Sequence, residues 1–212
     1  MSASAATIRV LLVDDHEVVR SGFRRLIEQS AIVCAEAADG DEAYRVYAQC
    51  NPDVTVMDLN MPGMGGLESL RRILARHSSA RVLVFSMHDS IAFVNQALRA
   101  GARGYITKAS AAEVLIDGIE AVARGERYLS PDLEQRASLA DEAQPHPLSQ
   151  LTAREFELFR LFAEGRTVDD IAAALNISHK TVANYQTQIR QKLNISSPVD
   201  LVRLALQYGV IV

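Results

Sequence analysis

The stretch VTVMDLNMPG, residues 54–63, joins a short, mostly apolar run to a turn containing proline and glycine, with Asp58 at the junction. A short apolar run bounded by turn residues is typical of a strand buried on both faces. Similar runs lie at residues 10–13, 32–35, 82–85 and 104–106. Helical patterns follow the five runs at residues 18–27, 41–49, 67–76, 91–100 and 111–124. This alternation predicts an α/β domain with a doubly wound, five-stranded parallel sheet.

Polar residues follow the predicted strands where each strand ends. Asp14 and Asp15 follow the first strand, Asp58 the third, Ser86 the fourth and Lys108 the fifth. Ligands of a doubly wound sheet bind at the carboxyl ends of its strands, so we expect these side chains to converge. Each residue alone also fits an ordinary role as a helix cap, a loop carboxylate or a solvated lysine.

The combination of these residues favours a phosphoryl-binding site. Three carboxylates in one crevice repel each other, which favours a raised pKa or a bound cation. Oxygen ligands with open water positions suit Mg²⁺. A hydroxyl and an ammonium opposite the metal would complete the cage around a phosphoryl group.

These motifs resemble the receiver domain of bacterial two-component response regulators, over residues 7–125. The resemblance implies that Asp58 is the phospho-acceptor and that Mg²⁺ is the cofactor. It implies that Asp14, Asp15, Asp58 and the backbone carbonyl of Asn60 hold the metal. A phosphohistidine on a sensor histidine kinase would be the phosphodonor.

The resemblance also assigns the groups around the phosphate. Ser86 would bond a phosphoryl oxygen, Lys108 would pair with it, and Tyr105 would be the aromatic residue that swings inward on activation. The chain departs from the family at Ala109, where many receivers carry proline after the lysine. The resemblance therefore does not fix the geometry of the loop after the fifth strand, although the charge of Lys108 is retained.

The chain changes character after Gly125. Residues 126–147 contain three prolines and more acidic than basic side chains, which predicts a linker with at most a helical turn or two.

From residue 148 the pattern is purely helical, and Thr152 with Glu155 predicts a capping box. Four short helices are predicted, the second and third separated by the turn at residues 176–179. This order predicts a helix-turn-helix whose third helix enters the major groove of DNA.

The second domain, residues 148–212, resembles the LuxR-type output domain. The matching stretches are LTARE (151–155), FAEG (162–165), DIA (170–172), LNIS (175–178), KTV (180–182) and KL (192–193). With a receiver in front, the chain resembles a response regulator of the NarL/FixJ type. The resemblance implies a flavodoxin-like sheet of order 2-1-3-4-5, followed by a small four-helix DNA-binding domain.

The third helix of the second domain carries the predicted DNA contacts. These are Lys180, Thr181, Ala183, Asn184, Thr187 and Lys192. Asn184 suits adenine, whose N6 and N7 an amide can bond. Family members often have lysine and histidine where this chain has Ala183 and Tyr185. The domain has seven basic and six acidic residues, so one copy should bind phosphates weakly and dimerisation should matter.

The last helix has more apolar side chains than one core face needs. We expect a homodimer on phosphorylation, through Val199, Val202 and Leu206. Full burial of this helix within its own domain is the alternative explanation.

The favoured function is a phosphorylation-controlled transcription regulator that binds promoter DNA and is not an enzyme. An output domain that binds protein instead of DNA is a second possibility. A phosphohydrolase is disfavoured, because Asn60, two residues after Asp58, cannot protonate a leaving group. RNA polymerase is a further candidate partner. No signal peptide or membrane span is recognisable, which favours the cytoplasm.

Overall fold

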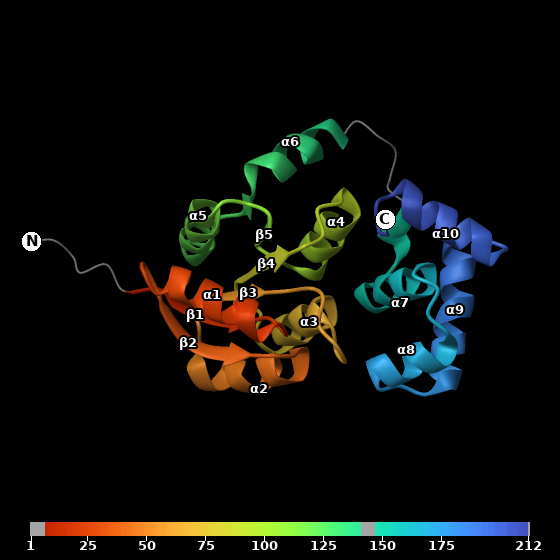
Figure 1. Cartoon of the computed structure of the whole chain (residues 1–212), viewed down its shortest axis with the longest axis horizontal. Helices are drawn as coiled ribbons and strands as arrows, with labels where there is room; N and C mark the ends of the chain where they lie inside the picture. Colours follow the sequence, from red (N-terminus) through yellow and green to blue (C-terminus); the bar gives the residue numbers. More distant parts are fainter. Residues whose placement is uncertain (1–6, 141–146, 212) are drawn as a thin grey trace, which may run out of the picture.

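The computed structural model describes residues 7–140 and 147–211, and Figure 1 shows how the elements are arranged. The amino-terminal part alternates strands and helices: β1 (Arg9–Val13), α1 (Glu17–Ile27), β2 (Ile32–Ala37), α2 (Gly40–Cys50), β3 (Val54–Met57), α3 (Gly66–Arg76), β4 (Val82–Ser86), α4 (Ile91–Ala100), β5 (Gly104–Thr107) and α5 (Ala112–Ala123). The remainder contains β6 (Tyr128–Leu129), α6 (Pro131–Ala140), the 3₁₀ turn η1 (Pro147–Gln150), α7 (Ala153–Ala163), α8 (Val168–Leu175), α9 (His179–Leu193) and α10 (Pro198–Gln207).

The sheet is parallel, with the strand order β2-β1-β3-β4-β5-β6. The predicted order of the first five strands is confirmed, but the predicted strand number is wrong. Tyr128 pairs with Gly104, and Leu129 pairs with Tyr105, so β6 adds a sixth strand at the β5 edge. The strand has only two residues, which is too short to produce a recognisable apolar run.

Side chains of the central strands alternate between two apolar layers. Val10 and Leu12 of β1 pack into the layer covered by α1 and α5. Leu11 and Val13 pack into the opposite layer, beneath α2, α3 and α4. This period of two residues is what a strand buried on both faces requires. The core of the sheet thereby fixes which polar residues reach its carboxyl edge.

The segment predicted as a linker is largely structured in its first half. After β6, helix α6 packs against α4, with Leu133 fully buried. Arg136 donates a hydrogen bond to Asp89 at 3.0 Å. Residues 141–146 of the predicted linker lie outside the described residues. The helix is longer than the turn or two expected from the acidic, proline-containing sequence.

The carboxyl-terminal helices begin at well-formed caps. The predicted capping box of α7 is present: Glu155 N–H donates to Thr152 Oγ1, and Thr152 N–H donates to Glu155 Oε2 at 2.8 Å. Two further boxes open α8 and α10. Asn176 and Asn194 end α8 and α9 in the left-handed conformation, with φ of 51° at each. Short, capped helices define the turn between α8 and α9.

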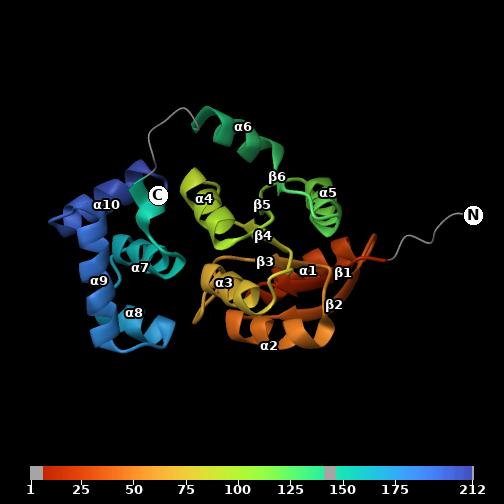
Figure 2. The same ribbon diagram turned by 180° about the vertical axis from the view of Figure 1, so that it is seen from behind.

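The two halves of the chain pack against each other through α7. Helix α7 contacts α3 and α4, and most of α9 lies on the far side of α7 from the sheet (Figures 1 and 2). Gln96 of α4 donates to the carbonyl of Leu148 at 2.7 Å. Gly65, with a φ of 62°, lies so close to Glu157 that a Cβ would meet its Oε1 at 2.2 Å. One apolar layer therefore continues from the sheet into the helical domain.

Candidate functional site

The carboxyl ends of β1, β3 and β5 bring three of the predicted site residues into direct contact. Lys108 Nζ lies 2.7 Å from Asp58 Oδ2 and 2.5 Å from Asp14 Oδ2. All three side chains are almost fully buried, with exposures of 3% to 6%. Asp58 Oδ1 accepts a hydrogen bond from the backbone N–H of Asn60 at 3.2 Å. Residues separated by up to 94 positions thus form one ion-paired cluster.

Burial sets the ionisation of this cluster. It raises the pKa of Asp58, although the neighbouring Lys108 ammonium acts in the opposite direction. Burial also disfavours the charge of Lys108, but the bonds to Asp14 and Asp58 outweigh it and raise the pKa of the lysine. Lys108 therefore stays protonated, while Asp58 is more basic than an exposed carboxylate. A basic, charge-compensated carboxylate is suited to nucleophilic attack on an anionic group.

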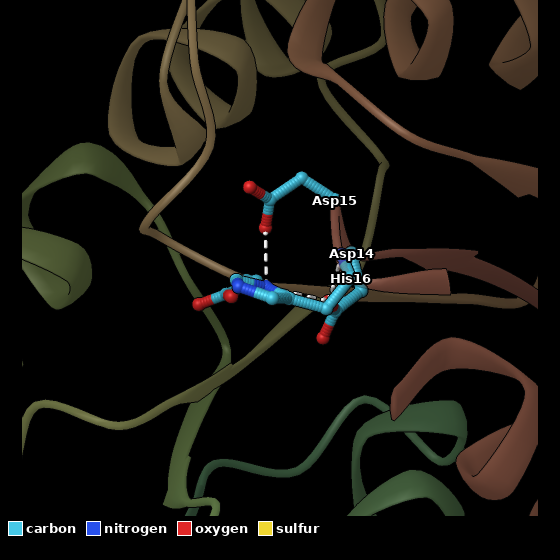
Figure 3. Close-up of side chains that lie close together, drawn as sticks. Asp14, Asp15 and His16 are labelled. Carbon is cyan, nitrogen blue, oxygen red and sulfur yellow. Dashed lines mark hydrogen bonds and ion pairs between the residues drawn. The ribbon is translucent and has the colours of Figure 1, made fainter. Parts of the chain in front are cut away.

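The residues after β1 add further potential metal ligands. Asp14, Asp15, His16 and Asp58 each offer one ligand atom, and these atoms lie within 4.8 Å of one another. Figure 3 shows the Asp15 carboxylate directed at the ring of His16, whose Nδ1 lies 2.8 Å from Asp15 Oδ1. The carboxylate oxygens form the hard, mostly anionic donor set that Mg²⁺ prefers. The site residues therefore fit a divalent cation.

Ser86 is the last residue of β4, and Tyr105 lies within β5. Both side chains are fully buried. The hydroxyl of Tyr105 donates to the carbonyl of His88 at 2.7 Å. Its ring already points inward here. The side chain predicted to turn inward is therefore held beneath the β4–α4 loop.

Two histidines near the site, His16 and His88, were not among the site residues predicted from the sequence. His16 joins the carboxylate cluster, and its position directly after Asp14 and Asp15 could have indicated this. His88 Nε2 lies 2.9 Å from Asn60 Oδ1, and burial lowers its pKa to about 4. No sequence pattern marks that contact, because it joins two loops after different strands.

The predicted DNA-contacting face of α9 is exposed. Lys180, Ala183, Asn184 and Thr187 are exposed, and because Ala183 and Asn184 lie three and four positions after Lys180 and four and three before Thr187, all four share one side of the helix. Val182 and Ile189 are buried on the opposite side. Thr181 is half-buried, and its Oγ1 lies 2.7 Å from the capping Ser178 Oγ. Packing of α7 against the sheet domain therefore leaves four of the predicted DNA contacts exposed, whereas Thr181 lines a cavity between the two halves of the chain.

Lys192 has a partner inside its own domain. Its Nζ lies 2.6 Å from Oε2 of Glu155, which is 3% exposed. Burial acts to raise the pKa of Glu155, but Lys192 and the donors of Thr152 outweigh it, so the pKa is lowered. Lys192 thus joins the end of α9 to the capping box of α7, in addition to its predicted role at DNA.

The parallel sheet, with a carboxylate cluster at its carboxyl edge, has the architecture of a receiver domain, and the capped helices form a helix-turn-helix domain. The family model "Response regulator receiver domain" matches residues 10–120, and "Bacterial regulatory proteins, luxR family" matches residues 149–205. The chain belongs to the two-component response regulators of the NarL/FixJ type, with a receiver and a LuxR-type DNA-binding domain.

Similar proteins match nearly the whole length of the chain. "Response regulator UvrY" of Escherichia coli K12 is 35% identical over 208 residues, which covers 96% of this chain and 95% of the relative. "Response regulator GacA" of Pseudomonas aeruginosa is 35% identical over 209 residues, covering 96% and 98%. A solved structure of RcsB from Salmonella enterica, bound to the promoter rprA with phosphomimetic BeF₃⁻, is 27% identical. Its TM-score is 0.70, and the match covers 93% of this chain and 98% of that one.

Among residues 7–140 and 147–211, each helix is too short or too polar to cross a bilayer.

Proposed function

We propose that Asp58 accepts a phosphoryl group from a partner histidine kinase, and that this modification controls the binding of promoter DNA by the second domain. The observation that carries the proposal is the buried contact of Asp58 with Lys108, beside the carboxylates that follow β1. Sequestered charge of this kind suits a nucleophile that must react with an anion.

The residues of the cluster have distinct roles in the transfer. An Asp58 oxygen attacks phosphorus, the bond from phosphorus to the kinase histidine breaks, and the imidazole leaves with the electron pair. Lys108 stabilises the charge that builds up on the phosphoryl oxygens, and Ser86 bonds one of them. Asp14, Asp15, Asp58 and the carbonyl of Asn60 would hold Mg²⁺, which when bound neutralises the repulsion between carboxylate and phosphate.

The exposed face of α9 supports DNA as the ligand of the second domain. Helix, turn and helix are capped so that Lys180, Ala183, Asn184 and Thr187 project from one side. RcsB, which is similar over nearly its whole length, is bound to promoter DNA in its solved structure. We expect the lysines to contact phosphates and Asn184 to contact a base edge.

Asn184→Ala is expected to relax the base preference at one position of each half-site, by about 1–3 kcal/mol. Binding to random DNA should change little, because an amide contributes no phosphate charge. Titration of operator and random duplexes at one salt concentration measures both effects. Equal losses on the two duplexes would assign Asn184 to the backbone instead.

Replacement of Lys180 or of Lys192 by alanine is expected to affect DNA binding in the same way but to affect the stability of the domain differently. Either change to alanine should weaken binding to all sequences similarly and lower the salt slope by about one unit. Lys192→Ala should also destabilise the domain by about 1–2 kcal/mol, because the buried Glu155 loses its charged partner and the lysine is partly screened by solvent. Lys180 is exposed, so its removal should leave unfolding unchanged. Urea unfolding of both variants makes the comparison. An unchanged midpoint in Lys192→Ala would contradict the structural role.

The dimer proposed on phosphorylation would form through α10. Val199 and Leu206 are 74% and 53% exposed, and Val202 lies between them on the same side of the helix. Apolar side chains of this exposure are available to a second copy. The remaining partner, RNA polymerase, would be contacted once the dimer is on the promoter.

A further inference from the structure

A continuous line of contacts leads from the loop after Asp58 to the DNA-binding domain. Its first member is His88, which lies two residues beyond Ser86. The His88 Nε2 atom lies 2.9 Å from Asn60 Oδ1, in the loop that carries Asp58. The His88 ring stacks on Phe93 of α4, with ring centroids 3.8 Å apart and planes at 3°.

Phe93 continues the line into α7. Its ring meets Phe156 edge-on, with centroids 5.0 Å apart and planes at 89°. Both rings are buried, with exposures of 3% and 1%. Phe156 also contacts Phe159, in the core of the helical domain. A stack followed by an edge contact is a favourable and geometrically selective aromatic arrangement.

The backbone of His88 is hydrogen-bonded to Ser86 and Tyr105, the two other residues proposed to respond to the phosphate. Its N–H donates to Ser86 Oγ at 3.3 Å, and its carbonyl accepts from the Tyr105 hydroxyl at 2.7 Å. Contacts from Asn60, Ser86 and Tyr105 therefore meet at one residue.

We propose that His88 is the positioning residue through which the state of Asp58 sets the docking of α7 on the receiver. The inference rests on the proposed phosphorylation of Asp58. A Ser86 hydroxyl that turns to a phosphoryl oxygen gives up its contact with the His88 N–H, and the loop must adjust. The ring cannot follow without leaving Asn60 or Phe93, and packed contacts of this kind switch between discrete arrangements.

Two hydrogen bonds between the domains report directly on docking. The Gly63 N–H donates to the carbonyl of Ala174 at 3.0 Å, and the Gln96 side-chain amide donates to the carbonyl of Leu148 at 2.7 Å. Separation of the domains breaks both bonds and exposes both amides to water. Their hydrogen-exchange rates therefore measure the docked population in the full-length chain.

The experiment compares amide exchange by NMR in wild type and His88→Ala, with and without a small phosphodonor and Mg²⁺. In the wild type, phosphorylation should accelerate exchange at Gly63 and Gln96 by about 5-fold or more, the lower end of typical coupling. In His88→Ala, exchange should already be fast without phosphate, and phosphorylation should add less than twofold. His88→Phe retains the stack and His88→Gln retains a donor for Asn60, so each should fall between the two.

His77→Ala is the matched control. His77 is a half-buried receiver histidine that also contacts a ring, with its centroid 4.8 Å from that of Tyr47. It follows the end of α3 remote from Asp58, so this variant should exchange like the wild type. Slow exchange in unphosphorylated His88→Ala, or an undiminished response to phosphate, would overturn the role of His88. Intact mass separates the two hypotheses: a wild type that gains no phosphate refutes the proposed function itself.

Discussion

Asp58→Asn is expected to abolish phosphorylation of this protein completely. The amide is nearly isosteric with the carboxylate but lacks the anionic oxygen that attacks phosphorus, so the receiver should remain folded. Incubation with a small phosphodonor and Mg²⁺, followed by intact mass measurement, shows whether a phosphoryl group is gained. Asp117→Asn, at an exposed position on α5, is the control and should be phosphorylated normally.

Phosphorylation of Asp58 is also expected to require Mg²⁺. Chelation of Mg²⁺ should prevent the mass gain in wild type, and Asp15→Asn should raise the Mg²⁺ concentration required. A phosphate gained by Asp58→Asn would assign the acceptor to another residue. A mass gain that persists without Mg²⁺ would remove the metal from the mechanism.

Val199→Asp is expected to weaken binding to an operator with two half-sites by about 10-fold or more, within the usual range of coupling energies. Two recognition helices must reach half-sites one helical turn apart, and α10 supplies the apolar surface proposed to hold them. Val199 is 74% exposed, so its replacement should not disturb the fold. Binding to a single half-site should be affected much less, because no dimer contact is used there.

Gln207→Asp is the matched control, because it places the same charge on the polar side of the same helix. Fluorescence titration of both variants on one and two half-sites makes the comparison. If Val199→Asp binds the double site as tightly as the control does, α10 is not the dimer surface.

Much of the receiver could be predicted from the sequence, because its signals are local. Each buried strand is a short apolar run, and Asp14, Asp58, Ser86 and Lys108 come at or just after the ends of such runs. The rule that carboxyl ends of parallel strands converge then brings Asp14, Asp58 and Lys108 together, as the structure confirms. The capping box at Thr152 was equally local, since its two members are three residues apart.

The features that escaped prediction depend on packing between distant segments. Two residues, Tyr128 and Leu129, become a strand only because the edge of β5 is available for pairing. The contact of His88 with Asn60 joins two loops that follow different strands. The pairing of Lys192 with Glu155 links the end of α9 to the start of α7. None of these produces a periodic or spacing pattern along the chain.

Control of DNA binding by phosphorylation is tested by the molecular mass of the protein on operator DNA, measured by light scattering with and without phosphorylation. Phosphorylation of Asp58 is expected to convert a weakly bound monomer into a dimer on two half-sites, with DNA binding tightened about 5- to 150-fold. By linkage, operator DNA should also favour the phosphorylated dimer. A fully phosphorylated protein that remains monomeric on its operator, with unchanged affinity, would contradict phosphorylation as the control of DNA binding.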